Sequence, residues 1–285
     1  MPHSTKNVRP IGRAFKDLTE RTMTEKLKFE VRPDKVALIT FNNPEKLNAF
    51  SNDMLDAYLA RLQECGERDD VRAVVVTGAG KGFCSGGDTG GMGAGEVPRT
   101  KDVKSGLWDR IQKIPQAVAA LDKPVLAAVN GVAVGAGMDM ALHADLRYAA
   151  KSARFAETYV RMGLVPGNGA CWFLPRIVGV QKALELLWTS KFLNADEAKD
   201  IGLVCDVFDD DKMLDEVLAI AAKIAAGAPI SVRLIKRLVQ QNQTMDLRSS
   251  LDMVSSHMTL ARLSDDHVEA IAAWREKRTG NFKGA

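Results

Sequence analysis

Short apolar runs that alternate with helical patterns are the feature that most constrains the fold of this chain. Between the runs lie segments whose apolar residues recur at helical spacing, such as residues 52–67 after Ser51 and residues 107–121. Strands that alternate with helices predict an α/β core with largely parallel strands. The predicted strands are rich in β-branched or small apolar residues and cover residues 36–41, 73–77, 125–129, 145–149 and 203–208.

The pattern changes after about residue 180, where helices are predicted in succession and no strand is predicted beyond Phe208. These helices cover residues 180–203, 211–227, 229–242, 246–262 and 264–278. We therefore expect a poorly ordered N-terminal extension over residues 1–22, an α/β core over 23–205 and a C-terminal helical region over 206–285. The apolar stripe of Ile220, Ala221 and Ile224 and the run over residues 251–263 predict packing, either on the core or on another copy of the chain.

Composition excludes several classes of function. The 285 residues include 39 basic and 36 acidic side chains, a net charge of +3, and the charges are interspersed, so that we expect no nucleic-acid partner. No apolar run is long enough to cross a bilayer, and we expect no membrane partner. The four cysteines are scattered without C-x-x-C spacing, which favours reduced thiols in a cytoplasmic protein. The four histidines are isolated from one another, so that no metal site is predicted.

Two glycine-rich turns each follow a predicted strand. The first is "KGFCSGGDTGG" over residues 81–91, and the second lies within "VNGVAVGAGMDMALHAD" over residues 129–145. Glycines let a ligand approach the backbone, and the start of a helix leaves N–H groups without partners. Two such turns side by side could aim two N–H donors at one developing oxyanion. Alternatively, the glycines serve only tight turns and close packing.

Two side chains near these turns are candidates for chemistry. Asp139 lies in the first turn of the helix that the second turn opens. An acid at that position is either a charge favoured by the helix dipole or a functional carboxylate. Cys84 lies before two glycines, but there is no G-x-S-x-G motif and no assignable partner, which argues against a nucleophile.

Five motifs in order resemble the enoyl-CoA hydratase/isomerase, or crotonase, family over residues 25–285. They are "NPEKLNAF", "GFCSGGD", "NGVAVGAGMDMAL", "FAETYVRMGLVPGNG" and "ADEAKDIGLV". The resemblance implies an α/β fold, a crotonase-like spiral of ββα units with a helical C-terminal region, and a homotrimer or homohexamer. It also implies an acyl-CoA substrate. Coenzyme A would enter as part of that substrate, with no separate cofactor and no metal.

The resemblance implies roles for particular residues. The backbone N–H groups of Gly87 and Ala136 would form an oxyanion hole for the thioester oxygen. Asp139 and Tyr159 fall at the positions of the two catalytic glutamates. The substrate-binding residues that the resemblance implies are Lys46, Leu47, Asn48, Gly86, Asp88 and Gly135.

This sequence departs from the family pattern at both catalytic positions. Asp139 is one methylene shorter than glutamate, and Tyr159, with an ordinary pKa of about 10, is a proton donor rather than a base near neutral pH. Glu157 is two residues from the motif position, and we expect it to face elsewhere. Asn168 stands where some relatives have an additional acid, and an amide cannot act as a base.

Several functions remain compatible with one carboxylate, one phenol and an oxyanion hole. Hydration of a 2-enoyl-CoA needs a base and an acid, which Asp139 and Tyr159 could supply. A single carboxylate also suits double-bond isomerisation, and carbon–carbon bond hydrolysis on a CoA thioester is a further alternative. A non-catalytic or RNA-associated role is the last alternative, and the dispersed basic charge argues against it.

Overall fold

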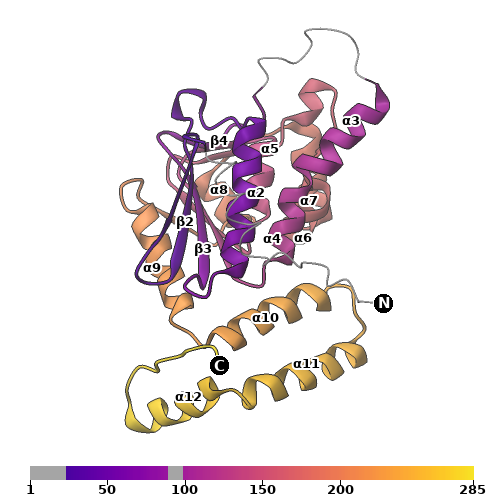
Figure 1. Ribbon diagram of the computed structural model, residues 1–285. Coiled ribbons are helices and arrows are strands. Elements are labelled where there is room, and N and C mark those ends of the chain that lie inside the picture. The colour runs from indigo at the N-terminus through magenta and orange to yellow at the C-terminus, as the bar shows by residue number, and fades with distance from the viewer. Residues whose placement is uncertain (1–23, 89–98) are drawn as a thin grey trace, which may run out of the picture.

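A computed structural model describes residues 24–88 and 99–285, so that the predicted extension over residues 1–22 lies outside the described residues. At its centre is a six-stranded sheet in the order β1-β2-β3-β5-β7-β10 (Figure 1). β1 pairs antiparallel with β2, and every other pair is parallel, as the alternation of strands and helices predicted. The strands are β1 (Leu27–Val31), β2 (Val36–Phe41), β3 (Ala73–Gly78), β5 (Val125–Val129), β7 (Leu146–Ala150) and β10 (Asp206–Phe208).

A second, four-stranded sheet was not predicted from the sequence. It contains β4 (Gly82–Cys84), β6 (Val132–Val134), β8 (Arg154–Ala156) and β9 (Leu193–Asn194) in that order. The first three strands are parallel and β9 is antiparallel. β4, β6 and β8 each follow a strand of the main sheet directly, so that the chain passes three times from one sheet to the other. Strands of two or three residues are too short to show an alternation in sequence.

The helices of the core connect these strand pairs. The helix predicted over residues 107–121 is present as a π-helical turn, η3 (Leu107–Ile111), followed by α4. The single helix predicted over residues 180–203 is wrong, because β9 interrupts it. Asn194 accepts a hydrogen bond from the N–H of Glu197, whose side chain bonds back to the N–H of Asn194, and this capping box starts a new helix. The core helices are α2 (Asn52–Glu67), α3 (Thr100–Gly106), α4 (Lys113–Ala120), α5 (Ala136–Leu142), α6 (Ala170–Val178), α7 (Val180–Thr189) and α8 (Ala195–Asp200).

The main sheet carries apolar side chains on both faces. α9 (Met213–Ala225) covers one face with Val217 and Ala221, which pack with Val75 and Leu126 of the sheet. Ile220 and Ile224 are partly buried against the same cluster. Of the two alternatives for the apolar stripe on this helix, the structure shows packing on the chain's own core. Residues 206–225, which we grouped with the C-terminal region, thus contribute a strand and a helix to the core.

The last three helices lie together at one end of the molecule (Figure 1). They are α10 (Pro229–Asn242), α11 (Leu247–Arg262) and α12 (Asp265–Glu276), and neither α10 nor α11 has a buried residue. Apolar side chains of the run over residues 251–263 remain exposed, including Leu251, Met258 and Leu263. Among the described helices, none alone is long and apolar enough to cross a bilayer. α9 and α10 qualify only as a pair, and they meet at a bend of 105°.

Candidate active site

The two glycine-rich turns lie against each other. A Cβ atom at Gly86 would lie 3.2 Å from the carbonyl oxygen of Val134 and 3.6 Å from the nitrogen of Ala136, and the φ of Gly86 is +99°. A Cβ atom at Gly137 would lie 1.9 Å from the carbonyl oxygen of Cys84. Glycine is therefore required at residue 86 by conformation and at residue 137 by the close approach of the two backbones.

Each turn contains a backbone N–H group for which the described residues supply no hydrogen-bond acceptor. In the first turn, the N–H of Phe50 donates to Gly86 (2.8 Å) and the N–H of Asp88 donates to Phe50 (3.0 Å), so that the N–H of Gly87 is not used. In the second turn, Ala136 is the first residue of α5, where an N–H has no partner within the helix. These are the two groups predicted to form the oxyanion hole, and their role stays a prediction.

Asp139 and Tyr159, the two predicted catalytic residues, contact each other directly. Asp139 lies in the first turn of α5 and is fully buried. Its Oδ2 accepts a hydrogen bond of 2.5 Å from the hydroxyl of Tyr159, which begins η4 (Tyr159–Met162). Its Oδ1 has no partner among the described residues. One carboxylate oxygen is thus fixed by the phenol while the other is free to act.

Burial dominates the protonation of this pair. Loss of solvent raises the pKa of Asp139 to about 7, against the hydrogen bond from Tyr159, which lowers it. The main-chain N–H groups of Asn168 and Ala170 also favour the charged form, although neither makes a hydrogen bond of normal geometry to it. Burial and then the charge of Asp139 raise the pKa of Tyr159 above its ordinary value, so that the phenol stays protonated and acts as a donor.

Glu157 does not face away from the site, contrary to our expectation. It is 1% exposed, and neither of its carboxylate oxygens has a hydrogen-bond partner among the described residues. Burial first, and then the charge of Asp139, raise its pKa well above the ordinary value, so that the two carboxyl groups share one buried environment. Glu157 directly follows β8, and a prediction of that strand would have placed it at the strand's carboxyl end.

Two further buried polar residues flank Asp139. Nε2 of His143, the residue that follows α5, lies 2.8 Å from the carbonyl oxygen of Asn168. Burial lowers the pKa of His143 to about 4, so that the ring is neutral. The side chain of Asn168 is also buried, and its Oδ1 has no partner among the described residues. Cys84 is buried too, and burial raises its pKa to about 12, which opposes a role as a nucleophile.

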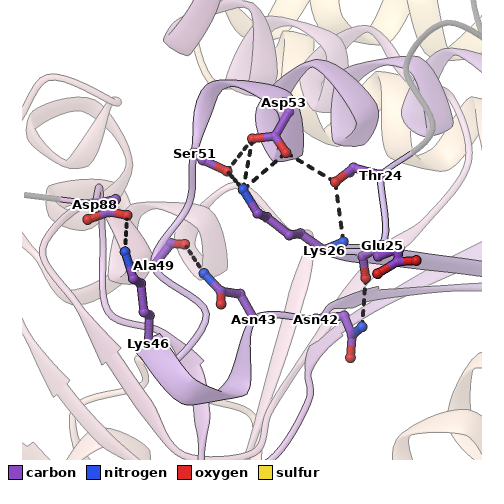
Figure 2. Close-up of polar contacts among 10 residues, drawn as sticks. All are labelled: Thr24, Glu25, Lys26, Asn42, Asn43, Lys46, Ala49, Ser51, Asp53 and Asp88. Carbon is purple, nitrogen blue, oxygen red and sulfur yellow. Dashed lines mark hydrogen bonds and ion pairs between the residues drawn. The ribbon is translucent and has the colours of Figure 1, made fainter. Parts of the chain in front are cut away.

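The turn that contains the predicted substrate-binding residues 46–48 packs against the first glycine-rich turn. The N–H of Ser85 donates to the carbonyl oxygen of Leu47 (3.0 Å), and its hydroxyl donates to that of Lys46 (3.1 Å). Nζ of Lys46 lies 2.6 Å from Oδ2 of Asp88 (Figure 2). The Lys46 side chain is 59% exposed, so that this ion pair sits at the surface beside the turn. The structure thus brings both predicted charged contacts for a substrate together.

Leu47 and Asn48 shape this turn differently. Both have left-handed backbone conformations, with φ of +48° and +57°. Asn48 is fully buried, and its Nδ2 donates to the carbonyl oxygens of Ala79 (2.9 Å) and Gly82 (2.7 Å). The buried side chain of Asn48 therefore fixes the turn to the residues beneath it. Only the backbone of Asn48 would remain to contact a substrate. Gly135, also at positive φ, donates its N–H to Ala156 (2.8 Å).

A separate polar cluster anchors the start of α2 beside β1. Lys26 donates to Ser51 (3.2 Å) and pairs with Asp53 (3.2 Å), and Thr24 donates to Asp53 (3.1 Å) (Figure 2).

Within residues 24–88 and 99–285, no three side chains of the histidine, cysteine or acidic type lie close enough to hold a metal ion.

Comparison with known proteins follows the same motifs. The family model described as enoyl-CoA hydratase/isomerase matches residues 32–285. A 1,2-epoxyphenylacetyl-CoA isomerase from Escherichia coli is 35% identical over 87% of this chain and 95% of its own length. A short-chain-enoyl-CoA hydratase from Clostridium acetobutylicum is 35% identical over 86% of this chain and 92% of its own.

Solved structures agree with the sequence matches. The crystal structure of an enoyl-CoA hydratase from Bacillus anthracis is 32% identical, has a TM-score of 0.86, and is matched over 92% of this chain and 100% of that one. This likeness confirms the crotonase-type α/β fold with a helical C-terminal region. The chain belongs to the enoyl-CoA hydratase/isomerase family, and it is an enzyme of the lyase or isomerase type.

Proposed function

We propose that this enzyme hydrates a 2-enoyl-CoA, adding hydroxyl to the β carbon and hydrogen to the α carbon of the thioester. The observation that carries the proposal is the buried Asp139 carboxylate, whose free Oδ1 lies near the start of α5, where the N–H of Ala136 is unused. The similarity to enoyl-CoA hydratases from Clostridium acetobutylicum and Bacillus anthracis supports it.

The chemistry divides between backbone and side chain. Addition of water to the conjugated double bond moves negative charge to the thioester oxygen, where the N–H groups of Gly87 and Ala136 would stabilise it. One well-placed donor of this kind is worth about 3 kcal/mol in the transition state. Asp139 takes the proton from water as the oxygen attacks the β carbon. Tyr159 holds Oδ2 of that carboxylate, and Oδ1, which has no partner among the described residues, is the oxygen left to take the proton.

Double-bond isomerisation is the second candidate, and the Tyr159 contact favours it. Because the phenol hydroxyl is engaged with Asp139 and its pKa is raised, Tyr159 is a poor independent acid or base. A single carboxylate that removes a proton and returns it elsewhere would then suffice. The similar Escherichia coli protein is named an isomerase.

The test is to incubate the purified protein with crotonyl-CoA and to follow the loss of the conjugated enoyl absorbance together with formation of 3-hydroxybutyryl-CoA. Hydration well above the rate of a blank is the expected result. If crotonyl-CoA is unchanged while a 3-enoyl-CoA is converted to the 2-enoyl isomer, the enzyme is an isomerase and the hydratase proposal is wrong.

We also propose that the chain assembles as a homotrimer or homohexamer in the cytoplasm, through the helices α10–α12. The support is that α11 buries none of its residues while Leu251, Met258, Leu260 and Leu263 are more than half exposed. Light scattering at micromolar concentration should give three or six times the chain mass of 31.0 kDa. A monomer under those conditions would contradict the assembly.

A further inference from the structure

Strand order explains why a second carboxyl group lies beside Asp139. β6 and β8 are neighbouring parallel strands of the smaller sheet, with Val134 opposite Ala156. The N–H of Gly135 continues the pairing by donating to Ala156 (2.8 Å). α5 begins two residues after β6, and Glu157 is the first residue after β8. Both acids therefore emerge at the carboxyl ends of adjacent strands.

Glu157 occupies an environment that a purely structural carboxyl group does not need. It is 1% exposed, and both its oxygens lack hydrogen-bond partners among the described residues. Burial of a carboxyl group without partners costs free energy that an apolar residue would avoid. Oδ1 of Asp139 is unpaired in the same way. Three unpaired carboxylate oxygens thus belong to one buried pair, and together they could hold the water and the reacting carbons of a substrate.

We propose that Glu157 is the second proton-transfer group of this site, and that it delivers a proton to the α carbon while Asp139 takes one from water. The inference rests on the proposed function and gives to Glu157 the task that the sequence analysis assigned to Tyr159. Tyr159 becomes a positioning residue, because its hydroxyl is committed to Oδ2 of Asp139 at 2.5 Å.

The proton balance closes within the pair. Water loses a proton to Asp139 as its oxygen bonds to the β carbon, and the π electrons of the double bond move to the thioester oxygen. The carbonyl re-forms as the α carbon bonds to the proton of Glu157. The proton on Asp139 then passes to the ionised Glu157, directly or through one water molecule. Both groups return to their starting states, and one water molecule has been added.

Electrostatics decides which acid holds the proton. Two carboxyl groups in one buried space do not both ionise, and their pKa values separate. Burial, the charge of Asp139 and then Cys171 at the start of α6 raise the pKa of Glu157 well above its ordinary value. The hydroxyl of Tyr159 supports the charged form of Asp139, whereas no hydrogen bond from the described residues supports the charged form of Glu157, so that we assign the proton to Glu157. No cation acts on either acid from the described residues, and His143, at the end of α5, is neutral.

The experiment compares wild type, Glu157→Gln and Glu157→Asp, with Glu185→Gln on the exposed face of α7 as the matched control. Hydration of crotonyl-CoA should lose about a hundredfold or more in kcat in Glu157→Gln, with KM changed less than about threefold, the size typical of a lost acid–base group. Glu157→Asp should recover part of the rate because it restores a carboxyl group. The fall of kcat/KM at high pH, where Glu157 loses its proton, should be absent from Glu157→Gln. If Glu157 served only in packing, its replacement would leave the fall of kcat/KM at high pH unchanged.

Two readouts are independent of hydration. Exchange of the α protons of butyryl-CoA with deuterium from the solvent needs only the α-carbon group, and it should be lost in Glu157→Gln. Carbon-13 NMR of the carboxyl groups in the ligand-free protein should show Glu157 titrating at lower pH in Asp139→Asn, because the neighbouring charge is gone. An unchanged titration would mean that the two acids are not a pair, and the proposal would fall.

Failure of the proposed function and failure of this inference give different results. If wild type hydrates crotonyl-CoA and Glu157→Gln keeps kcat within about threefold, the inference is wrong and the hydratase proposal stands. If wild type hydrates no enoyl-CoA, the hydratase proposal fails, and exchange of the α protons of butyryl-CoA then tests the role of Glu157. Exchange present in wild type and lost in Glu157→Gln supports the inference, and exchange equal in both, or absent from both, overturns it.

Discussion

The end of the smaller sheet and the C-terminal helices α10–α12 depart from the usual distribution of polar and apolar groups in opposite ways. Around Asp139, polar atoms are buried without partners. Of the eight such side-chain atoms among the described residues, five belong to Asp139, His143, Glu157 and Asn168. In α10 and α11 no residue is buried, and large apolar side chains such as Leu247, 74% exposed, face outward.

Each exception indicates a different missing partner. Buried polar atoms without partners cost free energy unless a ligand or water supplies the hydrogen bonds, so that the first region is suited to a polar substrate. Several large apolar side chains exposed on neighbouring helices are costly unless another surface covers them, so that the second region is suited to association. Changes at the first region should therefore affect chemistry, and changes at the second should affect assembly.

Asp139→Asn should give the largest effect. The amide keeps the shape of the side chain but cannot take a proton, and loss of a general base costs about a hundred- to ten-thousand-fold in rate. We expect this loss in kcat for crotonyl-CoA hydration, with Tyr159→Phe losing less because the phenol only positions the carboxylate. Near wild-type turnover in Asp139→Asn would remove Asp139 from the mechanism.

Gly137→Ala should damage both folding and activity. The new Cβ would lie 1.9 Å from the carbonyl oxygen of Cys84, and overpacking of this kind costs about 1–3 kcal/mol or more. Gly106→Ala in α3 is the matched control, because a Cβ there meets no atom within 4 Å. Urea denaturation should show a clear loss of unfolding free energy for Gly137→Ala and none for Gly106→Ala. Equal stability of the two variants would show that the turns are not in tight contact.

Glu157→Gln should change how stability depends on pH. The pKa of Glu157 is raised above its unfolded value of about 4.3, so that the folded state holds this proton more tightly than the unfolded state. The stability from this group is present below about pH 4.3 and is lost as pH rises toward the folded pKa. Wild type should therefore lose up to about 1.4 kcal/mol of unfolding free energy per pH unit relative to Glu157→Gln above that pH. Parallel pH curves in denaturant melts would contradict this.

Charges on the exposed face of α11 should act on assembly alone. Leu251→Asp with Met258→Asp places two carboxylates in the proposed interface and should weaken association by about tenfold or more, about 1.4 kcal/mol. Ser256→Asp, on the same helix, is the control for added charge. Light scattering across a dilution series should show dissociation only of the double variant. If the double variant changed kcat but kept the mass of the assembly, the separation of chemistry from assembly between the two regions would be wrong.

Lys46→Ala should give the smallest effect. Lys46 is 59% exposed and pairs with Asp88, so that its attraction for the phosphates of coenzyme A is screened by solvent and salt. We expect the apparent affinity for an acyl-CoA to fall about two- to fivefold at low salt, and the difference from wild type to vanish at high salt. Lys28→Ala, on the edge strand β1, should leave the affinity unchanged. No effect of Lys46→Ala at either salt concentration would place coenzyme A elsewhere.

Sequence alone predicted the main sheet well, because each of its central strands is long enough to form a distinct apolar run. β2 and β5 have the predicted bounds. The smaller sheet was not predicted because its strands have only two or three residues. Because β8 was not predicted, the position of Glu157 at its carboxyl end was not predicted either. The motifs of the family located Asp139 and Tyr159 as the candidate catalytic residues, but the hydrogen bond between them was not predicted. The burial of Glu157 depends on the pairing of β6 with β8, which no local pattern records.

The pH dependence of kcat/KM for crotonyl-CoA hydration tests the central claim, that an ionised Asp139 takes the proton from water, most directly. Burial raises the pKa of Asp139 to about 7, so that its reactive form is scarce at pH 5 and dominant near pH 8. We expect kcat/KM to rise about tenfold per pH unit at low pH and to bend near pH 7, and the rise to be absent from the residual activity of Asp139→Asn. A flat profile between pH 5 and 8, or the same bend in Asp139→Asn, would contradict the account.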